Sequence, residues 1–77
     1  MKKKIENLEC QQRFGELIRA ERKRKGLRQE DVAILLGMTK SYYGHIERGE
    51  RNVDFVLAIE ISQALGFDLS EFIKQYI

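Results

Sequence analysis

Residues 29–48, with the sequence QEDVAILLGMTKSYYGHIER, decide the fold of this 77-residue chain. A hairpin of two short helices needs a small residue where the helices cross and a turn residue that tolerates positive φ. Ala33 suits the crossing and Gly37 suits the turn. The positions that such a hairpin buries are all apolar here: Val32, Leu36, Met38, Tyr43 and Ile46. The stretch therefore predicts two helices joined by a tight turn.

Helical spacing continues on both sides of this stretch. Phe14, Leu17 and Ile18 lie on one helical face upstream, and Thr39 and Asp54 are suitable N-caps. No segment alternates with the period of a strand, so we predict an all-α, compact five-helix fold. Residues 1–10 are expected to be an N-terminal arm or a helical lead-in, and residues 11–77 a single domain. The expected helices cover residues 11–25, 29–36, 40–48, 55–65 and a segment from about 68 to near the C-terminus.

Composition excludes several classes of protein. The longest apolar runs, 32–36 and 55–59, have five residues each and are too short to span a membrane. No signal-peptide pattern follows the N-terminal lysines, which favours a cytoplasmic protein. With one cysteine and one histidine, the chain cannot form an internal disulfide and is poorly suited to a structural zinc site. No nucleophile motif or phosphate loop is present either, so we expect no enzyme, no cofactor, no small-molecule substrate and no membrane partner.

Charge is distributed unevenly along the chain. Residues 19–28 contain six basic side chains and one acidic side chain, whereas residues 54–77 contain one lysine and four acids. This asymmetry is typical of a protein that meets phosphate with one face, although a solvated helix face would have the same composition.

The hairpin at 29–48 is a helix-turn-helix, whose second helix presents its exposed side chains to the major groove of DNA. The chain resembles the Cro/phage-repressor (Xre-type) family of helix-turn-helix regulators of bacteria and phages, whose domains are lambda-repressor-like. Its size makes it most similar to the controller proteins of restriction–modification systems. The segments that carry the resemblance are LRQEDVA (27–33), GMT (37–39), IERGER (46–51) and ALGFDLSEF (64–72).

The resemblance implies a sequence-specific, dimeric regulator that represses or activates transcription from double-stranded DNA. It implies that Arg22 and Glu47 form a structural ion pair, and that Tyr43 belongs to the core. Arg28 departs from the family, which usually has Ser or Thr at this N-cap. The residues implied to reach phosphates are Gln29, Arg48 and Arg51. Those implied to read bases are Lys40, Ser41, Tyr42, Gly44 and His45, where Gly44 either admits close approach to DNA or makes room for a neighbouring group.

More apolar residues follow position 54 than a small core needs. We expect a core-facing stripe of Phe55, Ala58, Ile59 and Leu65, and a homodimer interface built from the remaining apolar residues. Two such protomers would bind a two-fold symmetric operator. An antitoxin or adaptor module that uses the same fold to bind a protein partner is the alternative. The predicted interface residues are Val56, Leu57, Ile61, Phe72, Ile73, Tyr76 and Ile77.

Overall fold

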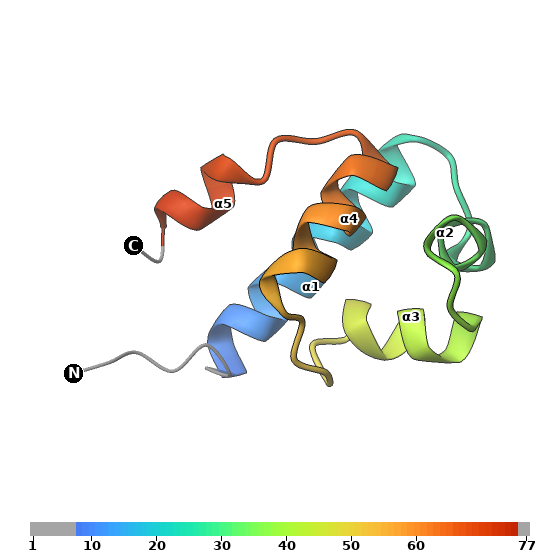
Figure 1. Ribbon diagram of the computed structural model, residues 1–77, viewed down its shortest axis with the longest axis horizontal. Helices are drawn as coiled ribbons and strands as arrows, with labels where there is room; N and C mark the ends of the chain where they lie inside the picture. The colour runs from blue at the N-terminus through green and yellow to red at the C-terminus, as the bar shows by residue number, and fades with distance from the viewer. Residues whose placement is uncertain (1–7, 76–77) are drawn as a thin grey trace.

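The computed structural model describes residues 8–75, which form five helices and contain no strand (Figure 1). This arrangement confirms the all-α prediction. Residues 1–7 and 76–77 lie outside the described part of the chain, and with them lie the predicted interface residues Tyr76 and Ile77. The helices are α1 (Leu8–Arg24), α2 (Gln29–Leu36), α3 (Lys40–Glu47), α4 (Phe55–Leu65) and α5 (Ser70–Lys74).

The helix bounds differ from the predicted ones mainly at the two ends of the chain. Helix α1 begins at Leu8, three residues before its predicted start, so residues 8–10 are helical. Helix α5 begins only at Ser70, because the Asp68 side chain holds the preceding turn. The Asp68 Oδ1 atom accepts hydrogen bonds from the Ser70 backbone N–H at 3.0 Å and the Ser70 hydroxyl at 2.8 Å. The bounds of α2 and α4 agree with the predicted ones.

Side chains cap the three central helices. Thr39 accepts a hydrogen bond from the Tyr42 N–H at 3.0 Å, and Asp54 accepts one from the Leu57 N–H at 2.8 Å. A guanidinium has no acceptor, so Arg28 cannot cap α2 in this way. Its backbone N–H instead donates to the Asp31 carboxylate at 2.8 Å. In this contact the side chain of the third helical residue accepts from the N-cap backbone, and it stabilises the first turn of α2.

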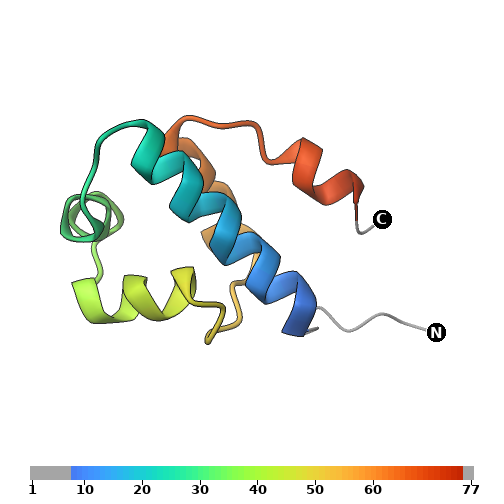
Figure 2. The same cartoon turned by 180° about the vertical axis from the view of Figure 1, so that it is seen from behind.

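The core lies between the long helices and the hairpin of α2 and α3. Helices α1 and α4 pack side by side: α4 lies in front of α1 in Figure 1, and α1 lies in front of α4 in Figure 2, which is seen from behind. Helix α5 lies at the other end of the molecule from α2, and its Phe72 ring meets Phe14 of α1 edge to face at 5.5 Å between centroids. The largest fully buried side chains are Ile18, Val32, Tyr43, Ile46, Ile61 and Leu65.

Two predicted placements on α4 are wrong. Ile61, predicted at the dimer interface, is fully buried in the protomer's own core. Phe55, predicted to face the core, is 64% exposed. The buried residues of α4 are Ile61, Ser62 and Leu65, in its second half, where α4 packs against α1 and α2. Phe55 begins the helix and therefore lies beyond this packed region.

Gly15 allows α1 and α3 to approach closely. A Cβ atom at this position would lie 2.3 Å from the Glu47 carbonyl oxygen and 2.8 Å from the Ile46 carbonyl oxygen. Because both neighbours are backbone atoms, a larger residue would have to separate the two helices. A glycine inside a helix lowers the stability of the helix by about 1 kcal/mol relative to alanine. The close contact of α1 with α3 explains why Gly15 is present despite this cost.

Candidate nucleic-acid interface

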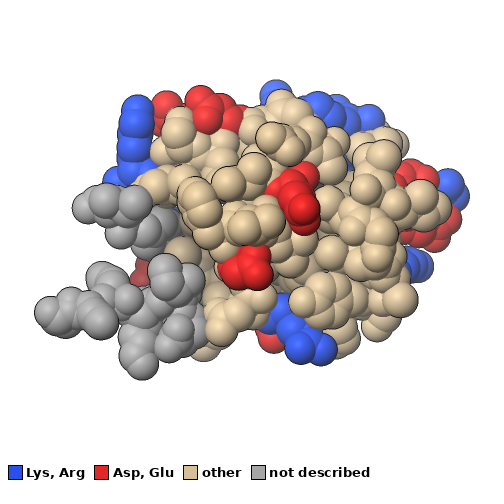
Figure 3. Space-filling model, viewed as in Figure 1, with Lys and Arg blue, Asp and Glu red and all other residues tan. Residues whose placement is uncertain are grey.

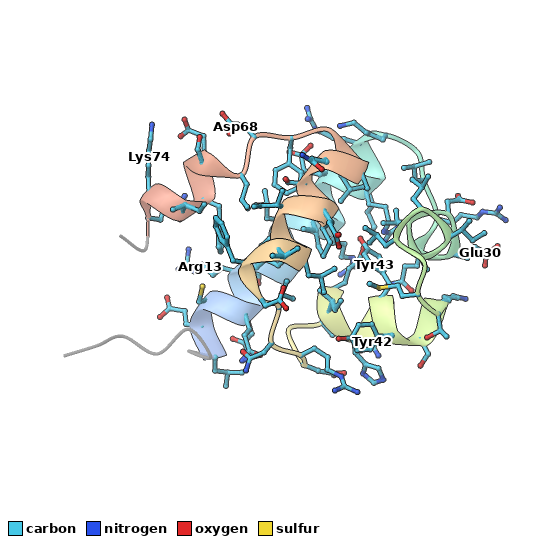
Figure 4. The ribbon with its side chains drawn as sticks, in the orientation of Figure 1. Arg13, Glu30, Tyr42, Tyr43, Asp68 and Lys74 are labelled. Carbon is cyan, nitrogen blue, oxygen red and sulfur yellow. The ribbon has the colours of Figure 1, made fainter. Side chains whose placement is uncertain are left out.

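Helix α3 has one buried face and one exposed face. Its residues Tyr43, Ile46 and Glu47 are buried, whereas Lys40 and Ser41 are exposed. In Figure 4, Tyr43 points toward the interior and Tyr42 points away from it. The exposed face can thus present polar side chains to a ligand while the other face holds the helix in place.

A buried ion pair anchors α3 to α1. Arg22 Nε donates to Glu47 Oε2 at 2.6 Å, and Arg22 Nη2 donates to Glu47 Oε1 at 3.2 Å. Arg22 also donates from Nη1 to the Leu27 carbonyl at 2.8 Å. Arg22 and Glu47 are only 8% and 5% exposed, so each charge depends on the other for compensation.

The surroundings keep Glu47 ionised. Burial raises the pKa of this carboxyl, but hydrogen bonds from Arg22 and Gln29 outweigh burial and the pKa is lowered. The hydrogen bond to Glu47 raises the pKa of Arg22.

Beside the pair, the Tyr43 hydroxyl is buried and has no hydrogen bond of good geometry to any residue in the described range. Its burial raises the pKa of Tyr43, which stays neutral in the core.

Gln29 links the buried pair to the surface. Its Nε2 atom donates to Glu47 Oε1 at 3.0 Å from the first position of α2. The predicted phosphate contact of Gln29 would therefore use its second N–H or its neighbouring backbone amides. The helix N-terminus adds partial positive charge at this point.

Gly44, which is predicted to face the groove, is buried in the protein without DNA. The side chains of Gln29 and Arg48 lie over it. A Cβ at Gly44 would lie 3.3 Å from Arg48 Nη1 and 3.6 Å from Gln29 Oε1. Both neighbours are ends of long side chains that can move, so both predicted roles of Gly44, close approach to DNA and room for a neighbouring group, stay predictions.

A polar cluster at the end of α3 contains one residue that the sequence analysis missed. His45 Nδ1 lies 2.6 Å from Glu50 Oε1, and Arg48 Nε donates to the same oxygen at 3.4 Å. The hydrogen bond with His45 lowers the pKa of Glu50. Glu50 stands between Arg48 and Arg51 in the sequence, which was the available signal. The geometry of two residues five positions apart across a helix end is not fixed by the sequence, so the contact with His45 could not be predicted.

The remaining predicted site residues surround this face. Arg51 lies over the Tyr42 ring, 5.1 Å from its centroid, in a cation–π contact that restricts both side chains. A cavity of about 410 Å³ is lined by Arg19, Arg22, Gln29, Glu47 and Arg48. Arg19, which is exposed, thus shares this cavity with Gln29 and Arg48.

An apolar groove lies between the start of α1, the segment 51–54, the start of α4 and α5. It has a volume of about 390 Å³, and Phe55 lies at its edge. Val56 is 63% exposed beside it, whereas Leu57, Phe72 and Ile73 are half-buried. The face of the molecule over α4 is mostly uncharged but carries two acidic patches near its centre, with Lys and Arg gathered toward its rim (Figure 3). The groove is lined by Cys10, Gln11, Phe14, Arg51, Asn52, Val53, Asp54, Phe55, Ala58, Leu69, Phe72 and Ile73.

Two kinds of feature are missing from the part of the chain that the structure describes. No group of His, Cys, Asp or Glu side chains there could hold a metal ion. None of the helices between residues 8 and 75 is long and apolar enough to cross a membrane.

Known proteins resemble this chain in both sequence and structure. The helix-turn-helix family model matches residues 18–72. Control protein C.MunI of a Mycoplasma species is 43% identical over 60 residues, which cover 77% of this chain and 81% of that protein. The HTH-type transcriptional regulator YqaF of Bacillus subtilis is 33% identical over 57 residues, covering 74% and 75% of the two chains. The crystal structure of the restriction-modification controller protein C.AhdI from Aeromonas hydrophila superposes with a TM-score of 0.76 at 38% identity, covering 84% of this chain and 94% of that one.

Proposed function

Because this chain belongs to the helix-turn-helix family, we propose that it is a sequence-specific, dimeric DNA-binding regulator of transcription that controls a restriction–modification system. Relatives named as a control protein and as a restriction-modification controller support this assignment. We assign it no catalytic activity and no cofactor. Its place of action is the cytoplasm, where bacterial DNA lies.

The arrangement of polar groups around α3 carries this proposal. Lys40 and Ser41 are exposed at the start of the helix, where they can reach base edges. The side chains of Gln29 and Arg48 lie over Gly44 of the same helix and Arg51 lies over Tyr42, where they can contact phosphates beside the groove. Contacts to phosphates position a protein on DNA, and contacts to base edges select the sequence.

Selection from a library of randomised duplexes tests this assignment. We expect the unmutated chain to enrich one sequence, and Lys40→Ala or Ser41→Ala to change the bases preferred. Arg51→Ala should weaken binding to all sequences, because it removes a phosphate contact, and should change base preference only where Tyr42→Ala changes it, because Arg51 lies over the Tyr42 ring. A library from which the unmutated chain enriches no sequence would contradict the proposal.

The apolar groove and the exposed side chains at the start of α4 support the homodimer. Phe55 and Val56 are large, apolar and exposed side by side, and such surfaces usually mark interfaces. Leu57, Phe72 and Ile73 contribute from the half-buried rim of the same region. To read two half-sites in successive major grooves of a symmetric operator, such a dimer would hold its two α3 helices about 34–36 Å apart.

Charged substitutions at the exposed positions test the dimer. Val56→Glu should give a folded monomer that binds the operator much more weakly, because a carboxylate would have to be desolvated in the interface. Leu35→Glu is a matched control, because Leu35 is 62% exposed on α2 and does not line the groove. Sedimentation equilibrium and circular dichroism give the two readouts. If the unmutated chain is a monomer at micromolar concentration and binds one half-site with full affinity, the dimer is excluded.

A further inference from the structure

We infer that Glu50 is a positioning residue for base readout: it holds the His45 ring so that Nε2 accepts a hydrogen bond from an amino group on a base edge, adenine N6 or cytosine N4. This inference rests on the proposed function, which places α3 in the major groove. It deepens that proposal by stating which chemical groups of the DNA one residue recognises.

The contact between the two side chains determines where the imidazole proton lies. An ionised carboxylate can only accept hydrogen bonds, and His45 keeps the pKa of Glu50 low. The 2.6 Å contact between His45 Nδ1 and Glu50 Oε1 therefore requires a proton on Nδ1. Arg48 Nη2 also lies 3.3 Å from Nδ1, and as a donor it could bond there only to a lone pair, so the two contacts exclude each other. We assign the proton to Nδ1 because the contact with Glu50 is the shorter of the two and is charge-assisted.

The backbone places Glu50 for this role. The Glu50 N–H donates to the His45 carbonyl at 2.9 Å, so the residue is tied to the last turn of α3. Its side chain also accepts from Arg48 at 3.4 Å. These contacts favour a position of the carboxylate beside the ring before any DNA is bound, which reduces the ordering cost on binding.

A proton on Nδ1 determines whether Nε2, the other ring nitrogen of His45, donates or accepts a hydrogen bond. A neutral imidazole carries one N–H, so a proton on Nδ1 leaves a lone pair on Nε2. In the major groove, adenine N6 and cytosine N4 are donors, whereas guanine O6 and N7 and thymine O4 are acceptors. A neutral His45 in this tautomer therefore pairs with adenine or cytosine and disfavours guanine and thymine.

Nuclear magnetic resonance of the free protein tests the tautomer without DNA. His45 is the only histidine of the chain, so its ring nitrogen signals need no assignment by mutation. At a pH where the ring is neutral, we expect the proton on Nδ1. Glu50→Ala should abolish this preference, and Glu50→Gln should keep it because the carboxamide oxygen still accepts. A proton on Nε2 in the unmutated chain would overturn the inference.

Binding-site selection tests the readout. The base position whose preference disappears in His45→Ala should be occupied by adenine or cytosine on the contacted strand. Glu50→Ala should reduce discrimination at that position by about tenfold or more, and leave the positions that respond to Lys40→Ala unchanged. Guanine or thymine at the His45 position, no position that responds to His45→Ala, or unchanged discrimination in Glu50→Ala would each overturn this inference alone. Failure of the unmutated chain to enrich any sequence would overturn the proposed function with it.

Discussion

Raising the salt concentration from about 50 to 200 mM should weaken binding of this protein to duplex DNA by about 10³–10⁵-fold, if it contacts about six to ten phosphates per complex. Each basic side chain that contacts a phosphate releases counterions from the DNA, and this release makes the binding constant more dependent on the salt concentration. Gln29 and Arg48 line a cavity with Arg19, and Arg51 lies beside the exposed face of α3. Fluorescence anisotropy titrations over a salt series give the slope directly.

Single variants show whether these residues are the source of the salt dependence. Arg51→Ala should lower the slope of log K against log salt by about one. Arg13→Ala is the matched control, because Arg13 is an exposed arginine of α1 at the opposite end of the molecule from α2 (Figure 4). Its removal should leave the slope unchanged. Affinity that is independent of salt would exclude the phosphate contacts altogether.

Removing either partner of the buried ion pair should cost on the order of 3–5 kcal/mol of folding free energy, because the other charge would remain buried without compensation. Domains of this size have about 4–12 kcal/mol in total, so each single variant is expected to be close to unfolding. Arg22→Ala with Glu47→Ala should cost less than the sum of the two single changes. Urea denaturation of all four proteins closes this double-mutant cycle.

A surface pair provides the control for this cycle. Arg24 and Glu21 are 2.8 Å apart, but the Arg24 side chain is 70% exposed, so their coupling should be at most about 1 kcal/mol. Additive effects of Arg22→Ala and Glu47→Ala would contradict the pairing. The pKa of Glu47 is lowered in the folded protein, so its contribution is present above the unfolded-state pKa and is lost as the pH falls through the folded-state pKa. The Glu47→Gln variant should lack this part of the acid destabilisation.

The hairpin was predictable because its determinants are local. Ala33, Gly37 and the apolar residues at fixed offsets specify two helices and a turn, and the structure places α2 on the predicted residues. The orientation of α4 was less predictable. Both Phe55 and Ile61 are apolar, and only the positions of α1 and α2 decide which of them is covered.

Exposure on α3 was predictable where it depends on one helical face and unpredictable where it depends on neighbouring elements. The exposure of Lys40 and Ser41 follows from their helical offsets relative to the buried Tyr43. The burial of Gly44 depends on side chains that lie over it from α2 and from the end of α3. The role of Glu50 depends on how the chain turns after α3, which helical periodicity does not specify.

The separation of the two faces of α3 has a consequence for how such a protein can diverge. Residues Tyr43, Ile46 and Glu47 maintain the fold, and their side chains are not exposed. Lys40 and Ser41 are exposed, so random mutation can exchange them at little cost to stability. Gene duplicates could therefore acquire new operators by drift at these two positions while inheriting an unchanged core. His45 is different because it shares contacts with Arg48 and Glu50. We expect these three positions to co-vary among proteins that descend from a common ancestor.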